Sequence, residues 1–144
     1  MRRVGETVAA GHIYPHFYWL LFLSTRFSRS LKMQLHLSTW TEIEAYLKTS
    51  RGIILPIGST EQHGPTGLIG TDAICAETIA RGVGEATGVV VGPTINVGMA
   101  LHHTAFPGSI SLRPSTLIAL IQDYVKPLAK SGFERFFFIN GHGG

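Results

Sequence analysis

The sequence has one cysteine, few charged residues and no apolar run long enough to span a membrane. Cys75 alone cannot form a disulfide within the chain, which is typical of a protein of the reducing cytoplasm. A zinc site built from several cysteine thiolates is excluded for the same reason. Any metal site must therefore use histidine and carboxylate ligands. Charged residues make up 15% and hydrophobic residues 44% of the 144 residues, which predicts a single folded domain.

The net charge is also low, at +3, and the basic residues lie away from the chemically interesting motifs. They gather in the N-terminal segment, at Arg2, Arg3, Arg26, Arg29 and Lys32. The rest of the chain is close to neutral, so the sequence lacks the basic surface of a nucleic-acid-binding protein. We therefore expect neither a nucleic acid nor a membrane as a partner.

Residues 1–32 differ in character from the remainder. Their apolar run at 17–23 is too short to cross a bilayer, and no small-residue cleavage site follows it. We expect residues 1–32 to be an N-terminal extension outside the fold, with the domain starting at Met33 and covering residues 33–144. The alternative is a segment that lies on a membrane surface.

Three apolar segments predict strands. Gly-Ile-Ile-Leu-Pro-Ile at 52–57 is typical of a strand that is buried on both faces of a parallel sheet, and residues 88–93 and 136–139 follow the same pattern. Residues 109–112 could form a further short extended piece.

Helix signals alternate with these strands. Thr39 and Glu42 match a capping box, and Pro114 suits the first turn of a helix with an apolar stripe that reaches Leu128. Pro127 should kink or shorten its last turn. A helix at about 73–85 would be capped by Asp72, and its apolar side would consist of Ile74, Ile79 and Val83. The alternation predicts an open α/β sheet with parallel strands. Cys75 is expected in its core.

Carboxylates and histidines follow the first predicted strand. Glu61 and His63 are two residues apart, so in an extended segment both project to one side, and the glycines of the loop let Asp72 return to them. Such side chains bind divalent metals in hydrolytic sites. Spacing alone is equally compatible with solvated loop residues and a helix cap.

Histidines also follow the other two predicted strands. His102 and His103 follow the second strand, where at most one of them should face a site, and His142 follows the third in a glycine-rich turn that Asn140 could orient. Taken alone, His142 could be an ordinary turn residue. Because the carboxyl ends of parallel strands meet at one edge, the three loops together predict a site there.

Three motifs in order resemble the creatininase (creatinine amidohydrolase) family over residues 38–144. They are Gly-Ser-Thr-Glu-Gln-His-Gly-Pro at 58–65 with Gly-Thr-Asp at 70–72, Phe-Pro-Gly-Ser-Ile-Ser-Leu at 106–112, and Asn-Gly-His-Gly-Gly at 140–144. The resemblance implies a three-layer α/β fold with an open, mostly parallel sheet, of which residues 33–144 are the N-terminal portion and the C-terminal part is missing. It also implies a homo-oligomer, a hexamer in the family.

The resemblance further implies a hydrolase that uses two divalent metal ions, zinc or manganese, or else iron. Four residues fall on the metal-ligand positions of the family, with Asp72 as the bridge: Glu61, His63, Asp72 and His142. Three fall on positions expected to contact the substrate: His103, Ala100 and Gly108. The catalytic base and acid are expected downstream of Gly144.

Two departures from the family pattern bear on the substrate. Creatininase carries a glutamate two residues after the last histidine, where this chain has Gly144, and many relatives have Ser and Glu where this chain has Ala100 and His102. We therefore expect a small-molecule substrate other than creatinine. The expected reaction is hydrolysis of a linear or cyclic C–N amide bond other than a peptide bond. The alternative is a catalytically incomplete fragment with no activity of its own.

Overall fold

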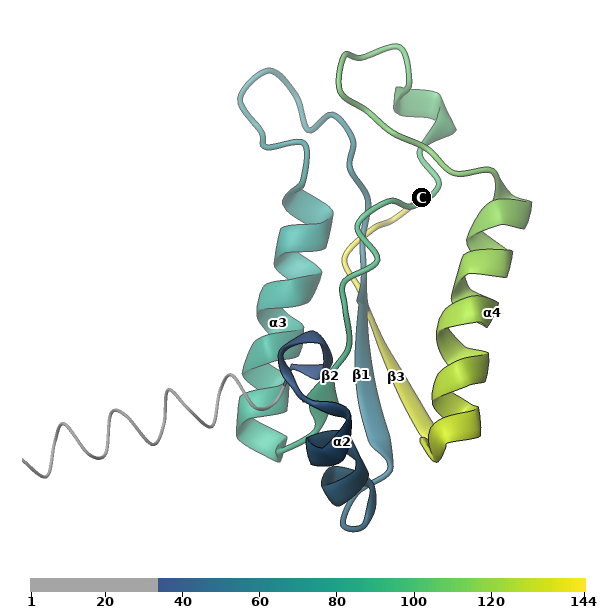
Figure 1. Cartoon of the computed structure of the whole chain (residues 1–144). Coiled ribbons are helices and arrows are strands. Elements are labelled where there is room, and N and C mark those ends of the chain that lie inside the picture. The colour runs from purple at the N-terminus through teal and green to yellow at the C-terminus, as the bar shows by residue number, and fades with distance from the viewer. Residues whose placement is uncertain (1–33) are drawn as a thin grey trace, which may run out of the picture.

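The structure, a computed structural model, describes residues 34–144, which form a parallel sheet between helices (Figure 1). The predicted extension over residues 1–32 lies outside the described residues. The strands are β1 Gly52–Ile57, β2 Val90–Val91 and β3 Arg135–Asn140. They pair in the order β2-β1-β3, and both pairs are parallel, as the sequence predicts.

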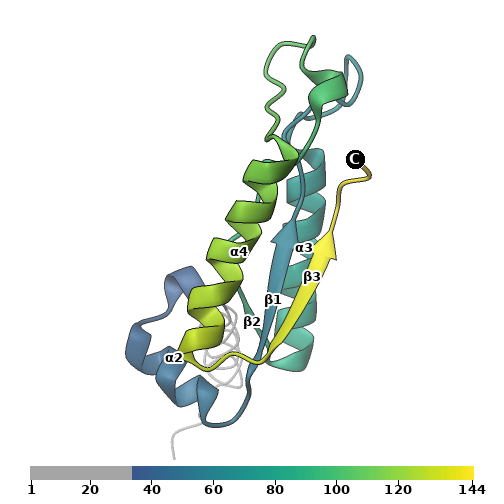
Figure 2. The same ribbon diagram turned by 90° about the vertical axis from the view of Figure 1, so that its right-hand side faces the viewer.

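Helices cover both faces of the sheet, which confirms the three-layer architecture (Figures 1 and 2). Helix α3, Thr71–Thr87, connects β1 to β2, and helix α4, Pro114–Ser131, connects β2 to β3. Strand β2 lies on one side of β1 and β3 lies on the other, so the two connections run in opposite directions across the sheet. Because both crossovers have the same hand, α3 and α4 lie on opposite faces. Helix α2, Trp40–Leu47, lies on the α4 side. No helix in residues 34–144 is both long and apolar enough to cross a membrane.

The alternating side chains of β1 form the centre of two apolar clusters. Ile53 and Leu55 pack with Val90 and Phe133 against α2 and α4. Ile54 points to the opposite face and packs with Val91 and Ala80 of α3. Because β1 is buried on both faces, its whole length can be apolar, as its sequence is. The observed strand has the predicted bounds.

Helix α3 departs from three predictions. It begins at Thr71 with Gly70 at its N-cap, so Asp72 lies inside the first turn and does not cap the helix. Its buried face consists of Ala73, Ala76, Ala80 and Gly84, whereas Ile74, Ile79 and Val83 are exposed. The helix packs close to the sheet, and the close approach selects small side chains over large ones. Cys75 is also exposed, contrary to the expected place in the core.

Helices α2 and α4 follow their sequence signals more closely. The capping box between Thr39 and Glu42 is present at the start of α2, and Pro114 occupies the first turn of α4. Of the two effects predicted for Pro127, a kink or a shorter last turn, the shortening is absent, because α4 continues to Ser131. Residues 109–112 contribute a single antiparallel bridge, between Thr60 and Ile110.

Candidate metal centre

The candidate ligands come from three segments that meet at the carboxyl edge of the sheet. Glu61 and His63 follow β1, Asp72 lies in the first turn of α3, and His142 follows β3. Strands β1 and β3 are neighbours, and the chain leaves β1 on one side and returns on the other. Ligand sites of open α/β sheets form at this kind of switch in strand order.

Two glycines bring the first turn of α3 against the strand ends. A Cβ on Gly58 would collide with the backbone at Asp72 and Ala73, and a Cβ on Gly141 would collide with the carbonyl oxygen of Asp72. Only glycine allows these approaches. Gly141, which comes directly before His142, thus lies against the helix turn that carries Asp72.

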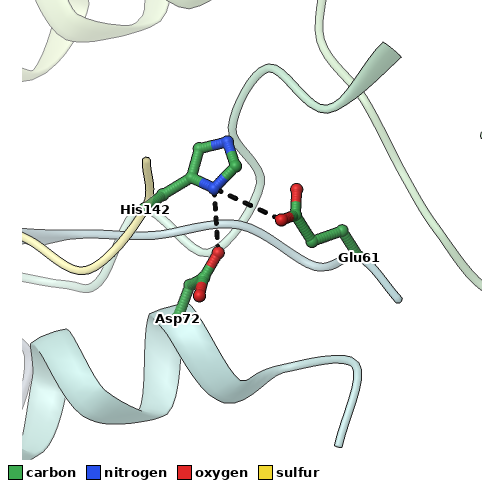
Figure 3. A group of neighbouring side chains, drawn as sticks. All are labelled: Glu61, Asp72 and His142. Atoms are coloured by element: carbon green, nitrogen blue, oxygen red, sulfur yellow. Dashed lines mark hydrogen bonds and ion pairs between the residues drawn. The ribbon is translucent and has the colours of Figure 1, made fainter. Parts of the chain in front are cut away.

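Three side chains converge on one point in Figure 3. The Nδ1 atom of His142 lies 2.9 Å from Oδ2 of Asp72 and 3.5 Å from Oε1 of Glu61. One ligand atom from each of these residues lies within 4.8 Å of the other two. The side chains of Glu61, Asp72 and His142 are only 8%, 11% and 8% exposed, so water screens their charges weakly.

The hydrogen bond made by Nε2 of His142 determines whether Nδ1 carries a proton or a lone pair. Nε2 of His142 lies 3.0 Å from the carbonyl oxygen of Met99, which can only accept, so Nε2 carries the proton. In a neutral ring Nδ1 then has a free lone pair, and this lone pair faces two carboxylates. A cation bound between the Nδ1 lone pair and the two carboxylates would remove the electrostatic repulsion between them.

His63 repeats this arrangement on the other oxygen of Asp72. Its Nδ1–H donates to the carbonyl oxygen of Glu61 at 3.0 Å, and its Nε2 lies 3.0 Å from Oδ1 of Asp72. The hydrogen bond to the Glu61 carbonyl is the largest cause that raises the pKa of His63 above the usual histidine value; burial opposes it, and the Asp72 carboxylate adds to the rise. Each oxygen of Asp72 therefore faces a different histidine.

An unpartnered polar atom supports a cation at this place. Oε2 of Glu61 is buried and has no hydrogen-bond partner among the described residues, as is also true of the Ser59 hydroxyl. Buried carboxylate oxygens are costly unless a hydrogen bond or a metal compensates them. Two carboxylates and two histidine lone pairs are the donor set that zinc and manganese take in proteins, so the residues fit such an ion.

The predicted substrate residues are less closely grouped. His103 lies in the short 3₁₀ helix Leu101–His103, with Nε2 3.8 Å from Oε1 of Glu61, whereas its neighbour His102 is exposed. Ala100 is fully buried, and its backbone N–H donates to the Ser111 hydroxyl. Gly108 lies in an exposed turn with φ of +87°. Only His103 thus lies next to a predicted metal ligand.

Sequence reasoning missed two groups that hold the site in place. The carbonyl of Met99 orients His142, and the Gln62 side chain contacts His103. A backbone carbonyl has no sequence signal, but Gln62 stands between Glu61 and His63 and could have been considered. Asn140 orients the turn as expected, because its carboxamide accepts from the His142 N–H and donates to the His142 carbonyl.

Comparison with known proteins places this arrangement in a family. The family model described as "Creatininase: Creatinine amidohydrolase" matches residues 36–144. The mycofactocin precursor peptide peptidase of Mycolicibacterium smegmatis is 37% identical over 98 residues, which cover 64% of this chain and 39% of the relative. The creatinine amidohydrolase of Pseudomonas putida is 32% identical over 110 residues, covering 72% of this chain and 42% of the relative.

A third relative and two solved structures also match the chain. The 3-dehydro-scyllo-inosose hydrolase of Thermotoga maritima is 32% identical over 106 residues, covering 73% of this chain and 34% of the relative. A manganese creatininase structure superposes with a TM-score of 0.73 at 30% identity, covering 76% of this chain and 45% of that one. A creatininase variant of Zn-Zn type gives 0.72 at the same identity and coverage. The chain thus spans less than half the length of these proteins.

Proposed function

The chain belongs to the creatininase family, and from this premise we propose that its protein is a metal-dependent hydrolase that cleaves a C–N amide bond. The observation that carries the proposal is the convergence of Glu61, Asp72 and His142 at the carboxyl edge of the sheet. The relatives are named as hydrolases or peptidases, which supports hydrolysis as the reaction class.

We assign two ions to the site through the two oxygens of Asp72. Glu61, Asp72 and His142 would hold the first ion, and His63 with the other oxygen of Asp72 would contribute to the second. Manganese and zinc forms of creatininase support these metals, and iron has the same ligand preferences. When bound, such an ion polarises a substrate carbonyl and lowers the pKa of a coordinated water to about 7.

The residues of the chain prepare the site for that chemistry. The carbonyls of Met99 and Glu61 hold the histidine tautomers that leave lone pairs toward Asp72. The carboxylates supply negative charge in a weakly hydrated place, where electrostatic interactions are strong. The general base and the leaving-group acid are proposed to lie beyond Gly144.

The proposed substrate is a small molecule with a linear or cyclic amide. Gly144 stands where creatininase carries a glutamate, which argues against creatinine itself. A peptide bond is the second candidate, because one of the relatives is a peptidase at 37% identity. A homo-oligomer in the cytoplasm, a hexamer in the family, completes the proposal.

A chain without activity of its own is the alternative. Within residues 34–144, β3 pairs only with β1, and its Phe137 and Phe138 are 50% and 42% exposed. An exposed apolar strand at a sheet edge is characteristic of an incomplete packing surface.

One experiment tests the proposal at two levels. Zinc and manganese contents of the purified wild type, Asp72→Asn and His102→Ala are measured, and each protein is assayed with creatinine, other cyclic amides, linear amides and a short peptide. We expect Asp72→Asn to lose both metal and hydrolysis, because it removes the shared anionic ligand at constant size, while His102→Ala keeps both. Equal metal content in all three would contradict the site, and a metal-loaded wild type without hydrolysis would favour the inactive alternative.

A further inference from the structure

The side chain of Gln62 makes a contact that the metal-ligand assignments do not use. Its Nε2 lies 2.9 Å from Nδ1 of His103. The orientation of the carboxamide is fixed from the other end, because the Gly64 N–H donates to Oε1 of Gln62 at 2.8 Å. The Gln62 backbone N–H also donates to the Ser109 hydroxyl at 3.1 Å. The NH₂ group of Gln62 must therefore be the part that faces His103.

This orientation fixes the tautomer of His103. An amide NH₂ group can only donate, so Nδ1 of His103 accepts and the proton of the neutral ring lies on Nε2. That Nε2–H faces the metal centre, but its distance of 3.8 Å from Oε1 of Glu61 is too long for a hydrogen bond. The His103 side chain is 24% exposed, so the N–H can still meet a bound molecule.

His103 therefore differs from the two histidines proposed as ligands. His63 and His142 each donate a hydrogen bond to a backbone carbonyl and turn a lone pair toward Asp72. His103 accepts from Gln62 and turns an N–H toward the same centre, so it presents no lone pair to an ion. The ring of His102 lies against that of His103, with 4.0 Å between centroids and an angle of 46° between the ring planes.

We propose that Gln62 is a positioning residue that holds His103 in its Nε2–H tautomer, and that this N–H donates a hydrogen bond to an oxygen of the substrate at the metal centre. The assignment of that oxygen to an amide carbonyl rests on the proposed function. A neutral donor beside the metal would bind the carbonyl oxygen most strongly when negative charge develops on it.

The first experiment reads the tautomer directly, in protein with and without zinc. Nitrogen-15 NMR of the imidazole distinguishes a protonated from an unprotonated ring nitrogen, and the His103 signals are assigned by their absence in His103→Gln. We expect the proton on Nε2 in the wild type. In Gln62→Glu the carboxylate accepts where the amide donated, so Nδ1 should become protonated. Protonation of Nδ1 in the wild type, or an unchanged Nδ1 in Gln62→Glu, would overturn the positioning role.

The second experiment asks whether the Nε2–H contacts a bound oxygen, with inorganic phosphate as the probe on zinc-loaded protein. His103→Gln keeps an N–H near the position of Nε2, whereas His103→Asn places it near Nδ1. We expect His103→Asn to weaken phosphate binding by about tenfold and His103→Gln to bind much like the wild type. The matched control, His36→Gln at an exposed position in the helix Leu35–Leu37, should bind phosphate unchanged.

The two proposals fail in different ways. Zinc content should be the same in every His103 and Gln62 variant, because neither residue is a ligand. Equal phosphate affinity in His103→Asn and His103→Gln would overturn the donor role while leaving the metal site intact. Absence of zinc from the wild type would overturn the proposed function and the substrate contact with it, whereas the tautomer is still decided in the metal-free protein.

Discussion

Single hydrogen bonds to backbone carbonyls determine what His63 and His142 can bind. The carbonyls of Met99 and Glu61 accept hydrogen bonds from the distant nitrogens of His142 and His63, which leaves the near nitrogens free for an ion. Partners of this kind usually determine the orientation and basicity of metal-ligating histidines. The ligand set thus depends on backbone atoms as much as on side chains.

The raised pKa of His63 gives a pH dependence to the metal-free protein. The folded state binds this proton more tightly than the unfolded chain does, so the stabilisation is complete below the ordinary histidine pKa and disappears as pH rises through the folded value. We expect the difference in free energy of unfolding between wild type and His63→Gln to shrink as pH increases from about 5 to 8. Urea unfolding of the metal-free proteins measures it, with His102→Gln as control. A difference that grows with pH would contradict the assignment.

Residue types and their order indicated the candidate ligands before the fold was known. Glu61, His63, Asp72 and His142 each follow or precede a predicted element at the edge where sites form. The same reasoning could not show that Asp72 faces two histidines with two oxygens, because that depends on how the 58–70 loop closes. It also placed Asp72 at the helix cap, whereas α3 begins two residues earlier, at Thr71, and Gly70 is the N-cap.

At the scale of elements, the close approach of α3 to the strand ends carries Asp72 into the site. Gly58 after β1 and Gly141 after β3 both contact the first turn of the helix where a Cβ would not fit. The position of Asp72 is therefore determined by backbone packing as well as by its own hydrogen bonds.

Gly141→Ala should disturb both the fold and the site. The new methyl group collides with the carbonyl of Asp72, so we expect a loss of about 1–3 kcal/mol in the free energy of unfolding, together with weaker zinc binding. Gly143→Ala is the matched control, because a Cβ there meets nothing within 4 Å. Thermal unfolding and zinc titration compare the two variants. Equal behaviour would show that the helix and the strand end are not held in close contact.

Element types were predictable, but the buried face of α3 was not. The pattern of β1 predicted its bounds because a strand buried on both faces is apolar throughout. In α3 the largest apolar residues, Ile74, Ile79 and Val83, are exposed, and alanines face the sheet. Hydrophobic periodicity assumes that large side chains are buried, and it fails where a short distance between helix and sheet excludes them.

At the scale of the whole molecule, strand order brings distant parts of the chain together. The order β2-β1-β3 makes β1 and β3 neighbours, so Glu61 and His142 meet although 81 positions separate their numbers (142 − 61). The alternation of strands and helices predicted parallel pairing and the edge at which the loops gather. It did not predict which strand is central, because that depends on the side to which each crossover turns.

A metal ion bound at this edge should stabilise the whole molecule. Its ligands join the end of β1, the start of α3 and the end of β3, so unfolding must release the ion. At free zinc about 100 times the dissociation constant we expect a gain of about 2.7 kcal/mol, which corresponds to a rise in Tm of about 5–10 °C. Magnesium should give a smaller rise, because histidine ligands disfavour it.

Differential scanning fluorimetry of metal-free protein, with zinc or magnesium added and then removed by EDTA, measures these shifts. Asp72→Asn is the control, because it preserves size but removes the charge that faces both histidines. We expect it to lose most of the zinc-dependent shift, and chelation to reverse the shift in the wild type. A rise of equal size in Asp72→Asn would mean that the zinc responsible for it binds at a place where Asp72 is not a ligand.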